Sequence, residues 1–380
     1  MLKIIHLASD EKFIDRGVNF FREDKRTFNS MLVVSDVLNN NYITSKPDYR
    51  FSSKQEAEIC EVTNNYDAIV LHSLQRPFYK AIEESKNKFV IWIGMGFDYY
   101  DLIYPTKYHL MMEETKRFYI SEISNLSEDT IHDQIRNTKA SSEKLKIIRK
   151  IDAISTVLPC EHEMISSESI SLPRYLSWNY IYEDLEDIFS NRSFSKKRSV
   201  IIGNSSDPSN NHLDVLKILE GVNINPDEKI IAPLSYGNRK YAEKVEEIFD
   251  KKYGGKFIPL KEYMSIQDYT NILEGANTCI MGHKRQQGMG NIIMMLRLGY
   301  KVYMNEESPA YSFLKKNGIK LFSLKDIERM KDEITKPLEH HYIIENIRII
   351  KNLFNANKNR QRTKKIIDEM INKKLTHAKS

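Results

Sequence analysis

The stretch GHKRQQGMGN, residues 282–291, concentrates side chains that bind anions and hydroxyl groups. It follows the apolar run 277–281 and leads into a helix-like apolar pattern. An arginine can grip a diphosphate through two parallel hydrogen bonds and keeps its charge. Carboxamides can donate to sugar hydroxyls, and glycines let the backbone approach a ligand or permit a tight turn. The predicted ligand-binding residues here are Arg285, Gln286, Gln287, Gly288, Gly290 and Asn291. The alternative is a surface salt bridge with solvated amides.

A second such stretch is GNSSDPSNNH, residues 203–212, directly after the apolar run 200–202. A glycine followed by small hydroxyl and amide residues before a helix exposes backbone N–H groups, which attract phosphate together with the helix dipole. An ordinary N-cap would explain only one or two of these residues. The predicted anion-binding residues are Gly203, Asn204, Ser205, Ser206 and Asn210.

The third stretch is NEESP, residues 305–309, after the apolar run 301–304. Asn305 and Glu307 are its candidates, because a carboxylate here can accept hydrogen bonds from ribose hydroxyls. The alternative is a carboxylate that only favours a helix N-terminus. Ligands of open parallel sheets bind beyond the carboxyl ends of the strands. The three stretches therefore predict a nucleotide-diphosphate site.

The first half of the chain supplies candidate acid–base groups. Asp98, in GFDYYD after an apolar run, can act as the general base for a sugar hydroxyl if partial burial tunes its pKa. His72, at the end of the run 66–72, is its competitor or catalytic partner. Either residue can instead be a cap or a satisfied buried side chain.

Other ligand classes fit less well. Gly94-Met95-Gly96 follows a strand pattern, but a dinucleotide fingerprint needs a third glycine where Tyr99 stands. The sequence contains neither a phosphate-binding GxxxxGK[ST] loop nor an Asp-x-Asp pair for a divalent ion. We therefore predict a site without metal or other cofactor. We also predict no nucleic-acid partner, because aromatic residues are nearly absent from the basic segment 351–380.

Two alternating series of apolar strand patterns and helical segments should position these residues. The first series of predicted strands is 3–8, 30–35, 66–72, 88–95 and 152–158. The second is 199–202, 229–233, 256–259, 278–281, 301–304 and 320–322. This alternation predicts an α/β protein with two Rossmann-like, doubly wound domains facing a cleft.

The domain boundaries follow from changes in composition. Residues 1–185 are predicted as an N-terminal acceptor-side domain with a helical insertion at about 105–150. A charged, serine-containing linker near 183–198 leads to a nucleotide-binding domain at 195–336. The remainder, 337–380, is predicted as a C-terminal helix, about 342–375, and a basic tail.

The composition of the chain helps to predict where in the cell the protein is located. No apolar run approaches the roughly 18 to 20 residues of a membrane span, and the N-terminus lacks the features of a signal peptide. Three isolated cysteines fit a reducing cytoplasm. Residues 351–380 carry nine basic and two acidic side chains. This tail can be solvated, can pack on the first domain through Ile367, Met370 and Ile371, or can bind an anionic membrane surface.

The motifs resemble those of glycosyltransferase family 56. GNSSDPSNNH, PLSYGN with Tyr236, RQQGMGN and NEESP occur there in this order. The segment GFDYYDL is similar to the family's G-x-D-x-Y, and Ser9 and Asp10 also look shared, on the acceptor side. The insertion near 115–140 and the basic tail depart from the pattern.

The resemblance implies a GT-B enzyme of the TDP-N-acetylfucosamine:lipid II N-acetylfucosaminyltransferase, or 4-alpha-L-fucosyltransferase, type. Such an enzyme takes an amino-deoxy sugar from a TDP donor to a polyprenyl-diphosphate-linked saccharide for surface polysaccharide. It works in the cytoplasm, peripherally on the inner membrane. The alternatives are another nucleotide sugar or acceptor, or a non-catalytic sugar-nucleotide-binding protein.

Overall fold

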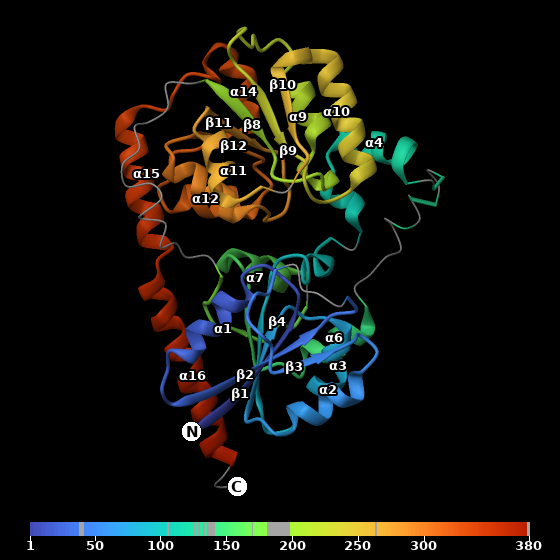
Figure 1. The fold of residues 1–380 in the computed structure, drawn as a ribbon, viewed down its shortest axis with the longest axis vertical. Coiled ribbons are helices and arrows are strands. Elements are labelled where there is room, and N and C mark those ends of the chain that lie inside the picture. The colour runs from blue at the N-terminus through green and yellow to red at the C-terminus, as the bar shows by residue number, and fades with distance from the viewer. Residues whose placement is uncertain are drawn as a thin grey trace. The chain divides into compact units, whose positions relative to one another are not determined.

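The computed structural model shows two compact units, each assembled from separate pieces of the chain (Figure 1). Unit 1 comprises Met1–Ile103, Lys139–Tyr182 and Asn355–Ser380, and unit 2 comprises Tyr104–Thr138 and Glu183–Phe354. The residues described are 1–37, 42–104, 106–124, 126–127, 130–131, 134, 141–168, 170–180, 198–262 and 264–377. Nearly all of the predicted linker therefore lies outside the described residues.

Unit 1 is built on a parallel sheet of seven strands in the order β3-β2-β1-β4-β5-β6-β7. The strands are β1 Leu2–Ser9, β2 Thr27–Val34, β3 Tyr49–Phe51, β4 Ala68–His72, β5 Phe89–Ile93, β6 Ala153–Ser155 and β7 Arg174–Tyr175. The central strands are almost continuously apolar and buried, as expected for a parallel sheet covered on both faces.

The covering helices of unit 1 are α1 Ile14–Arg22, α2 Glu56–Thr63, α3 Tyr79–Glu83, α6 Ser142–Ile148, α7 Pro159–Ser167 and α16 Ala356–His377, with 3₁₀ turns η1 Arg76–Phe78 and η2 Tyr100–Leu102. Helix α16 comes from the far end of the chain. Its residues Ile366, Ile367 and Met370 belong to the buried core that includes β1, β4 and β5. The prediction that the apolar stripe of the tail packs on the first domain is therefore confirmed.

Unit 2 contains a six-stranded parallel sheet in the order β10-β9-β8-β11-β12-β13. Its strands are β8 Ser199–Ile202, β9 Ile230–Pro233, β10 Phe257–Leu260, β11 Ala276–Met281, β12 Lys301–Met304 and β13 Phe322–Ser323. The strand order reverses between β8 and β11, and such a switch point opens a crevice at the carboxyl ends of the strands.

The helices of unit 2 from its larger piece are α9 His212–Ile218, α10 Arg239–Tyr253, α11 Ile266–Leu273, α12 Met289–Arg297, α13 Pro309–Lys316, α14 Leu324–Arg329 and α15 His340–Leu353, with 3₁₀ turns η5 Pro208–Asn210, η6 Gly254–Lys256 and η7 Lys331–Glu333. The single helix predicted at about 342–375 is thus two helices. The first ends at Leu353 in unit 2, and Phe354 and Asn355 separate it from α16 in unit 1.

The predicted insertion also differs in its place. The sequence predicts an insertion at about 105–150 in the first domain, whereas Tyr104–Thr138 forms part of unit 2. Its elements are η3 Lys107–Leu110, α4 Glu113–Phe118 and the π-helical turn η4 Tyr119–Ile123.

A carboxylate of α9 explains this placement. The side chain of Asp214 accepts hydrogen bonds from the backbone N–H groups of Glu114 and Thr115, at 2.9 and 3.0 Å. These N–H groups lie in the first turn of α4 and have no partner within that helix. Asp214 therefore caps α4 across about a hundred residues of sequence.

Candidate functional site

The structure brings the three polar stretches together at the carboxyl end of the second sheet. They form the connections from β8 to α9, from β11 to α12 and from β12 to α13. Ser209 Oγ donates to Gln287 Oε1 at 2.8 Å, which joins the first stretch to the second. Ser308 Oγ donates to the carbonyl oxygen of Arg285 at 3.4 Å, which joins the third to the second.

Much of the first stretch bonds to itself. Asn210 is fully buried, and its Oδ1 accepts from the backbone N–H of Asn204 at 2.9 Å and lies 2.7 Å from His283 Nε2. Its Nδ2 donates to Ser205 Oγ and to the carbonyl of Asp207, both at 3.0 Å. Asn210 and Ser205 thus hold the connection in shape, and their ligand-binding roles stay predictions.

The predicted PLSYGN corner closes one side of this connection. Ser206 N donates to the carbonyl of Tyr236 at 2.8 Å, and Asn204 Nδ2 donates to Tyr236 Oη at 2.8 Å. Asn204 Oδ1 is buried and has no hydrogen-bond partner among the described residues. Gly237 has a φ of 119°, and a Cβ there would lie 2.7 Å from the backbone nitrogen of Asp207. Only glycine suits this position.

The glycines of the first and second stretches have different roles. Gly203 and Gly288 both have left-handed φ values, 67° and 64°, and a Cβ on Gly288 would lie 3.0 Å from Asn204 Cγ. Gly288 is therefore required by the protein's own packing at the start of α12. A Cβ on Gly290 would meet nothing within 4 Å. Gly290 and the half-buried Asn291 leave the first turn of α12 open to a ligand.

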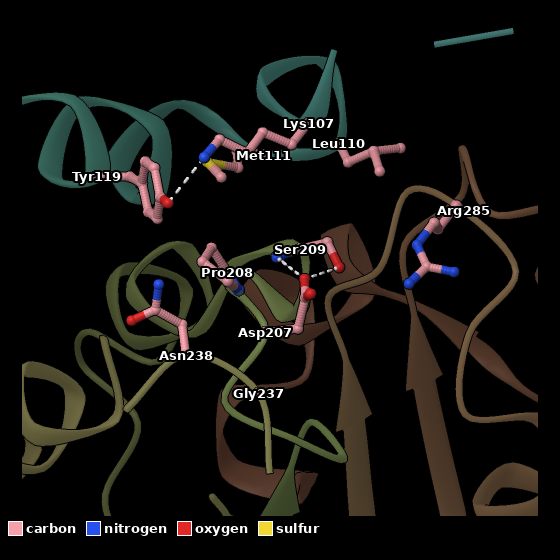
Figure 2. A pocket seen from close by; sticks show the side chains of 10 residues that line it. All are labelled: Lys107, Leu110, Met111, Tyr119, Asp207, Pro208, Ser209, Gly237, Asn238 and Arg285. Atoms are coloured by element: carbon pink, nitrogen blue, oxygen red, sulfur yellow. Dashed lines mark hydrogen bonds between the residues drawn. The ribbon is translucent and has the colours of Figure 1, made fainter. Parts of the chain in front are cut away.

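A cavity of about 360 Å³ lies against these connections (Figure 2). Its lining is Lys107, Leu110, Met111, Tyr119, Asp207, Pro208, Ser209, Gly237, Asn238 and Arg285. Figure 2 shows the first four residues on one side and Asp207, Pro208, Ser209 and Asn238 opposite them. The charged groups of the lining are one carboxylate and two cations, Lys107 and Arg285.

Among the predicted donor-binding residues, only Arg285 lines this cavity. Gln286 and Gln287 are buried beside it, and Arg285 Nη1 donates to the carbonyl of Gln286 at 3.4 Å. Asp207, Ser209 and Asn238 were missed, although they stand inside the quoted motifs. Lys107 was missed because nothing in its local sequence connects it to a segment about 180 residues later.

The third stretch borders a second cavity, of about 330 Å³, whose lining includes Met112, Asn305, Glu307 and Lys325. The carboxylate of Glu307 pairs with Lys284 at 3.1 Å. Asn305 Nδ2 lies 3.4 Å from the carbonyl oxygen of Gly282 and from Met112 Sδ. The predicted contact of Glu307 with ribose stays a prediction.

In unit 1, Asp98 is buried and holds a turn together. One carboxylate oxygen accepts from the backbone N–H of Leu74 at 2.9 Å and from Trp92 Nε1 at 2.6 Å, and the other accepts from Met95 N at 2.8 Å. Burial raises the pKa of Asp98, although these three hydrogen bonds act in the opposite direction. Its contacts are those of a structural carboxylate, and its role as a base stays a prediction.

His72 is also fully buried. Its Nε2 lies 2.9 Å from His6 Nδ1, and its Nδ1 is hydrogen-bonded to Tyr180 Oη. His6 Nε2 continues the chain to Asn29 Oδ1 at 3.0 Å. Burial lowers the pKa of His72 well below its usual range, and the neighbouring His6 lowers it further. Both ring nitrogens are therefore engaged within the protein.

The predicted acceptor-side pair, Ser9 and Asp10, lies at the end of β1. Ser9 Oγ donates to Gln75 Oε1 at 2.8 Å, and Asp10 Oδ1 accepts from the backbone N–H of Ile43 at 2.9 Å. The next residue, Glu11, is a candidate that the sequence analysis missed. Burial raises the pKa of the half-buried Glu11, and the charges of Asp10 and Asp98 raise it further. A carboxylate with a raised pKa suits a general base near neutral pH.

The described ranges also bear on metals and membranes. They contain no group of three or more His, Cys, Asp or Glu side chains that converges as metal ligands do. Independence from metal nevertheless stays a prediction. None of their helices is both long enough and apolar enough to cross a bilayer.

Comparisons with known proteins agree with this geometry. Residues 181–358 match the family model described as 4-alpha-L-fucosyltransferase glycosyl transferase group 56. The matched region contains all three polar stretches and the PLSYGN corner, so the resemblance recognised in the motifs is confirmed.

The solved structures that this chain resembles share its fold at low identity. HepE of Anabaena, in complex with UDP and glucose, has a TM-score of 0.63 at 11% identity, with 97% of this chain and all of that one covered. The lipopolysaccharide outer core galactosyltransferase WaaB has a TM-score of 0.62 at 9% identity, covering 97% of this chain and 99% of that one. A sucrose-phosphate synthase from Thermosynechococcus elongatus has a TM-score of 0.61 at 9% identity, covering 98% and 99%.

The strand orders of both sheets and these likenesses establish the GT-B fold, as the sequence predicted. The match of residues 181–358 to glycosyltransferase family 56, together with the GT-B fold, supports a fucosyltransferase-like glycosyltransferase.

Proposed function

We propose that this enzyme transfers an amino-deoxy sugar, N-acetylfucosamine or a close analogue, from a TDP-linked donor to a polyprenyl-diphosphate-linked saccharide in the synthesis of surface polysaccharide. The observation that carries the proposal is the family 56 match across every predicted donor-binding residue. The three connections are joined by hydrogen bonds, and the first two line a cavity with two cations, which supports a diphosphate ligand.

In this proposal Arg285 neutralises charge that develops on the leaving diphosphate. A preorganised donor of this kind is worth several kcal/mol, because it need not reorganise when the charge appears. In the same proposal the first turn of α12, where a Cβ on Gly290 would meet nothing within 4 Å, contributes its helix dipole to the diphosphate. We propose no metal ion, since an arginine and backbone dipoles supply the positive charge.

The acceptor hydroxyl needs a general base. Asp98 and Glu11 are the two candidates, and Glu11 has the fewer competing contacts. The carboxylate of Asp98 accepts three hydrogen bonds, whereas Glu11 has no side-chain hydrogen bond or ion pair within the described part of the chain.

An assay of sugar transfer with purified enzyme tests the proposed function. Purified enzyme, a TDP-amino-deoxy sugar and a polyprenyl-diphosphate-linked saccharide should yield free TDP and an extended lipid-linked product. If the enzyme discriminates between nucleotides, replacing TDP by UDP in the donor should lower kcat/KM. Binding of the donor without release of TDP would support the alternative of a sugar-nucleotide-binding protein and contradict the proposal.

We further propose that the enzyme works peripherally on the cytoplasmic face of the inner membrane. Several cations of the tail are used inside unit 1, because Lys373 pairs with Asp152 at 2.6 Å and Lys374 pairs with Asp67 at 2.7 Å. Lipid contact through the tail would then depend on exposed residues such as Lys364. Binding should weaken with salt, as the charges are screened.

Liposome co-sedimentation with anionic lipid tests this. Deletion of the tail is unsuitable, because α16 supplies buried core residues. Lys364→Gln combined with Lys365→Gln removes two exposed charges instead, with Lys240→Gln combined with Lys251→Gln on α10 as the matched control. Equal pelleting of both double variants, or no pelleting of the wild type at low salt, would exclude the tail as the membrane contact.

A further inference from the structure

The wall of the unit 2 cavity opposite the polar connections comes from a segment outside the family 56 match. Lys107, Leu110, Met111 and Tyr119 line it, and the match begins only at residue 181. Nothing in the motifs connects this segment with the donor. Side chains of this segment nevertheless line the cavity, and one of them, Lys107, carries a positive charge.

The ammonium group of Lys107 is held in place without a carboxylate. Its Nζ donates to Tyr119 Oη at 3.0 Å and lies 4.8 Å from the centre of the Tyr119 ring and 5.5 Å from that of Tyr108. Within the described residues Lys107 forms no ion pair. A cation over two aromatic faces keeps its charge uncompensated and loses little further freedom when an anion arrives.

The two tyrosines are themselves fixed. Tyr108 and Tyr119 are buried with Met111, Ile123 and Ile131 in a small apolar cluster, and their rings meet edge to face at 6.3 Å. Because these tyrosine rings are rigid, they hold the Lys107 ammonium group in a better defined position than that of a solvated lysine.

The segment is also tied to the donor-side motif. Asn211 Oδ1 accepts from the backbone N–H of Met112 at 2.7 Å, and Asn211 Nδ2 donates to the carbonyls of Leu110 and Gly282 at 3.3 and 2.8 Å. One asparagine of GNSSDPSNNH therefore joins the segment to both the first and the second polar stretch. Together with the Asp214 cap of α4, this fixes Lys107 relative to Arg285.

We propose that Lys107 is a second cation of the donor-binding site and binds the diphosphate of a nucleoside diphosphate sugar together with Arg285, with Tyr119 as its positioning residue. The proposal rests on the proposed function, since it needs a nucleotide-sugar donor. Asp207, the carboxylate in the same lining, would face hydroxyl or amide groups of the donor, because phosphate next to it would be repelled. Residues 107–119 thus contribute to the donor site.

The experiment measures the affinity of the full-length protein for TDP and UDP by isothermal titration calorimetry. Lys107→Ala should weaken binding of the preferred nucleotide about tenfold to a hundredfold, as expected for a lost charge-assisted hydrogen bond. Lys107→Arg should recover most of the affinity. The loss should shrink as salt is raised.

Lys116→Ala is the matched control, because Lys116 lies in the same segment on α4 and is absent from the cavity lining. Its affinity should stay within about twofold of the wild type, since Lys116 does not line the cavity that would hold the diphosphate. Tyr119→Phe keeps the ring and removes the hydroxyl that orients Lys107. It should weaken binding by a smaller factor than Lys107→Ala, with the same dependence on salt.

The outcomes separate the two proposals. Tight binding of TDP by the wild type with equal affinity in Lys107→Ala would overturn the role of Lys107 and leave the proposed function intact. Equal losses of affinity in Lys107→Ala and Lys116→Ala would mean that only the net positive charge of the protein matters. This result would contradict a specific contact between Lys107 and the diphosphate. A wild type that binds neither TDP nor UDP would contradict both.

Discussion

Asp98→Asn tests whether this carboxylate is a catalytic base or a structural clamp. Asparagine offers one acceptor oxygen and one donor group, whereas the buried carboxylate accepts from Leu74 N, Trp92 Nε1 and Met95 N. If the amide oxygen takes the two donors on one side, the amide nitrogen faces the backbone N–H of Met95. That N–H then stays buried without a partner.

The magnitude follows from these contacts. An unsatisfied buried donor costs about 1–3 kcal/mol, and the two remaining hydrogen bonds weaken because their acceptor is no longer charged. The variant should therefore lose about 3 kcal/mol of unfolding free energy in unit 1. For a unit of roughly 170 residues this lowers the melting temperature by about 6–12 °C.

The assay is tryptophan fluorescence during thermal unfolding. The chain has two tryptophans, Trp92 and Trp178, and both are buried in unit 1, so the signal reports on that unit. Glu163→Gln, an exposed substitution on α7 of the same unit, is the control and should leave the melting temperature unchanged.

An unchanged melting temperature together with abolished transfer and intact TDP binding would refute the structural reasoning and make Asp98 the base, as the sequence alone suggested. Glu11→Gln completes the test. If Glu11 is the base, this variant should lose transfer without losing stability, because no side-chain hydrogen bond of Glu11 is removed.

Further variants test unit 2. Arg285→Ala should lower kcat about a hundredfold to a thousandfold, as for the loss of one donor to a developing charge, with the melting temperature within a few degrees of the wild type; the exposed Arg239→Ala is its control, and an unaltered rate would remove Arg285 from the mechanism. Asp214→Ala should cost about 1 kcal/mol as a lost helix cap and speed amide hydrogen exchange in 113–119, measured by mass spectrometry, whereas unchanged exchange would contradict the capping role. Burial lowers the pKa of His212 to about 4 and that of His283 to about 3. Because the unfolded chain binds these protons near pH 6.5 and the folded chain does not, stability should be complete above pH 6.5 and fall by roughly 2 kcal/mol per histidine at pH 5. Urea midpoints between pH 5 and 8 measure this, and His212→Asn should flatten the profile.

The sequence predicted the fold well because both sheets are parallel and buried. Strands such as β8 and β12 are short, continuous apolar runs, and their predicted bounds agree with the structure. The edge strands β3 and β7 were missed, since YRF and RY are short and half-exposed and carry no such signal.

The site was predicted less completely, for a different reason. A motif shows which residue types stand at a connection, but it does not show which of them the protein uses for itself. Asn210 was predicted to bind the ligand and its neighbour Asn211 was not. In the structure Asn210 bonds its own turn, and Asn211 holds a segment about a hundred residues earlier. The capping of α4 by Asp214 depends on contacts that no local pattern encodes.

The division of the chain into pieces has a consequence for its synthesis. Unit 1 begins at the first residue, but its core includes Ile366, Ile367 and Met370 of α16. On the ribosome, where domains generally fold as they emerge, the sheet of unit 1 must wait with an uncovered apolar face while more than 170 residues of unit 2 are made. Unit 2 has all its pieces once residue 354 has emerged and can finish first. Unit 1, which starts the chain, is therefore the last to become native. An mRNA truncated shortly before the codons of α16 would yield a folded unit 2 attached to an incomplete unit 1.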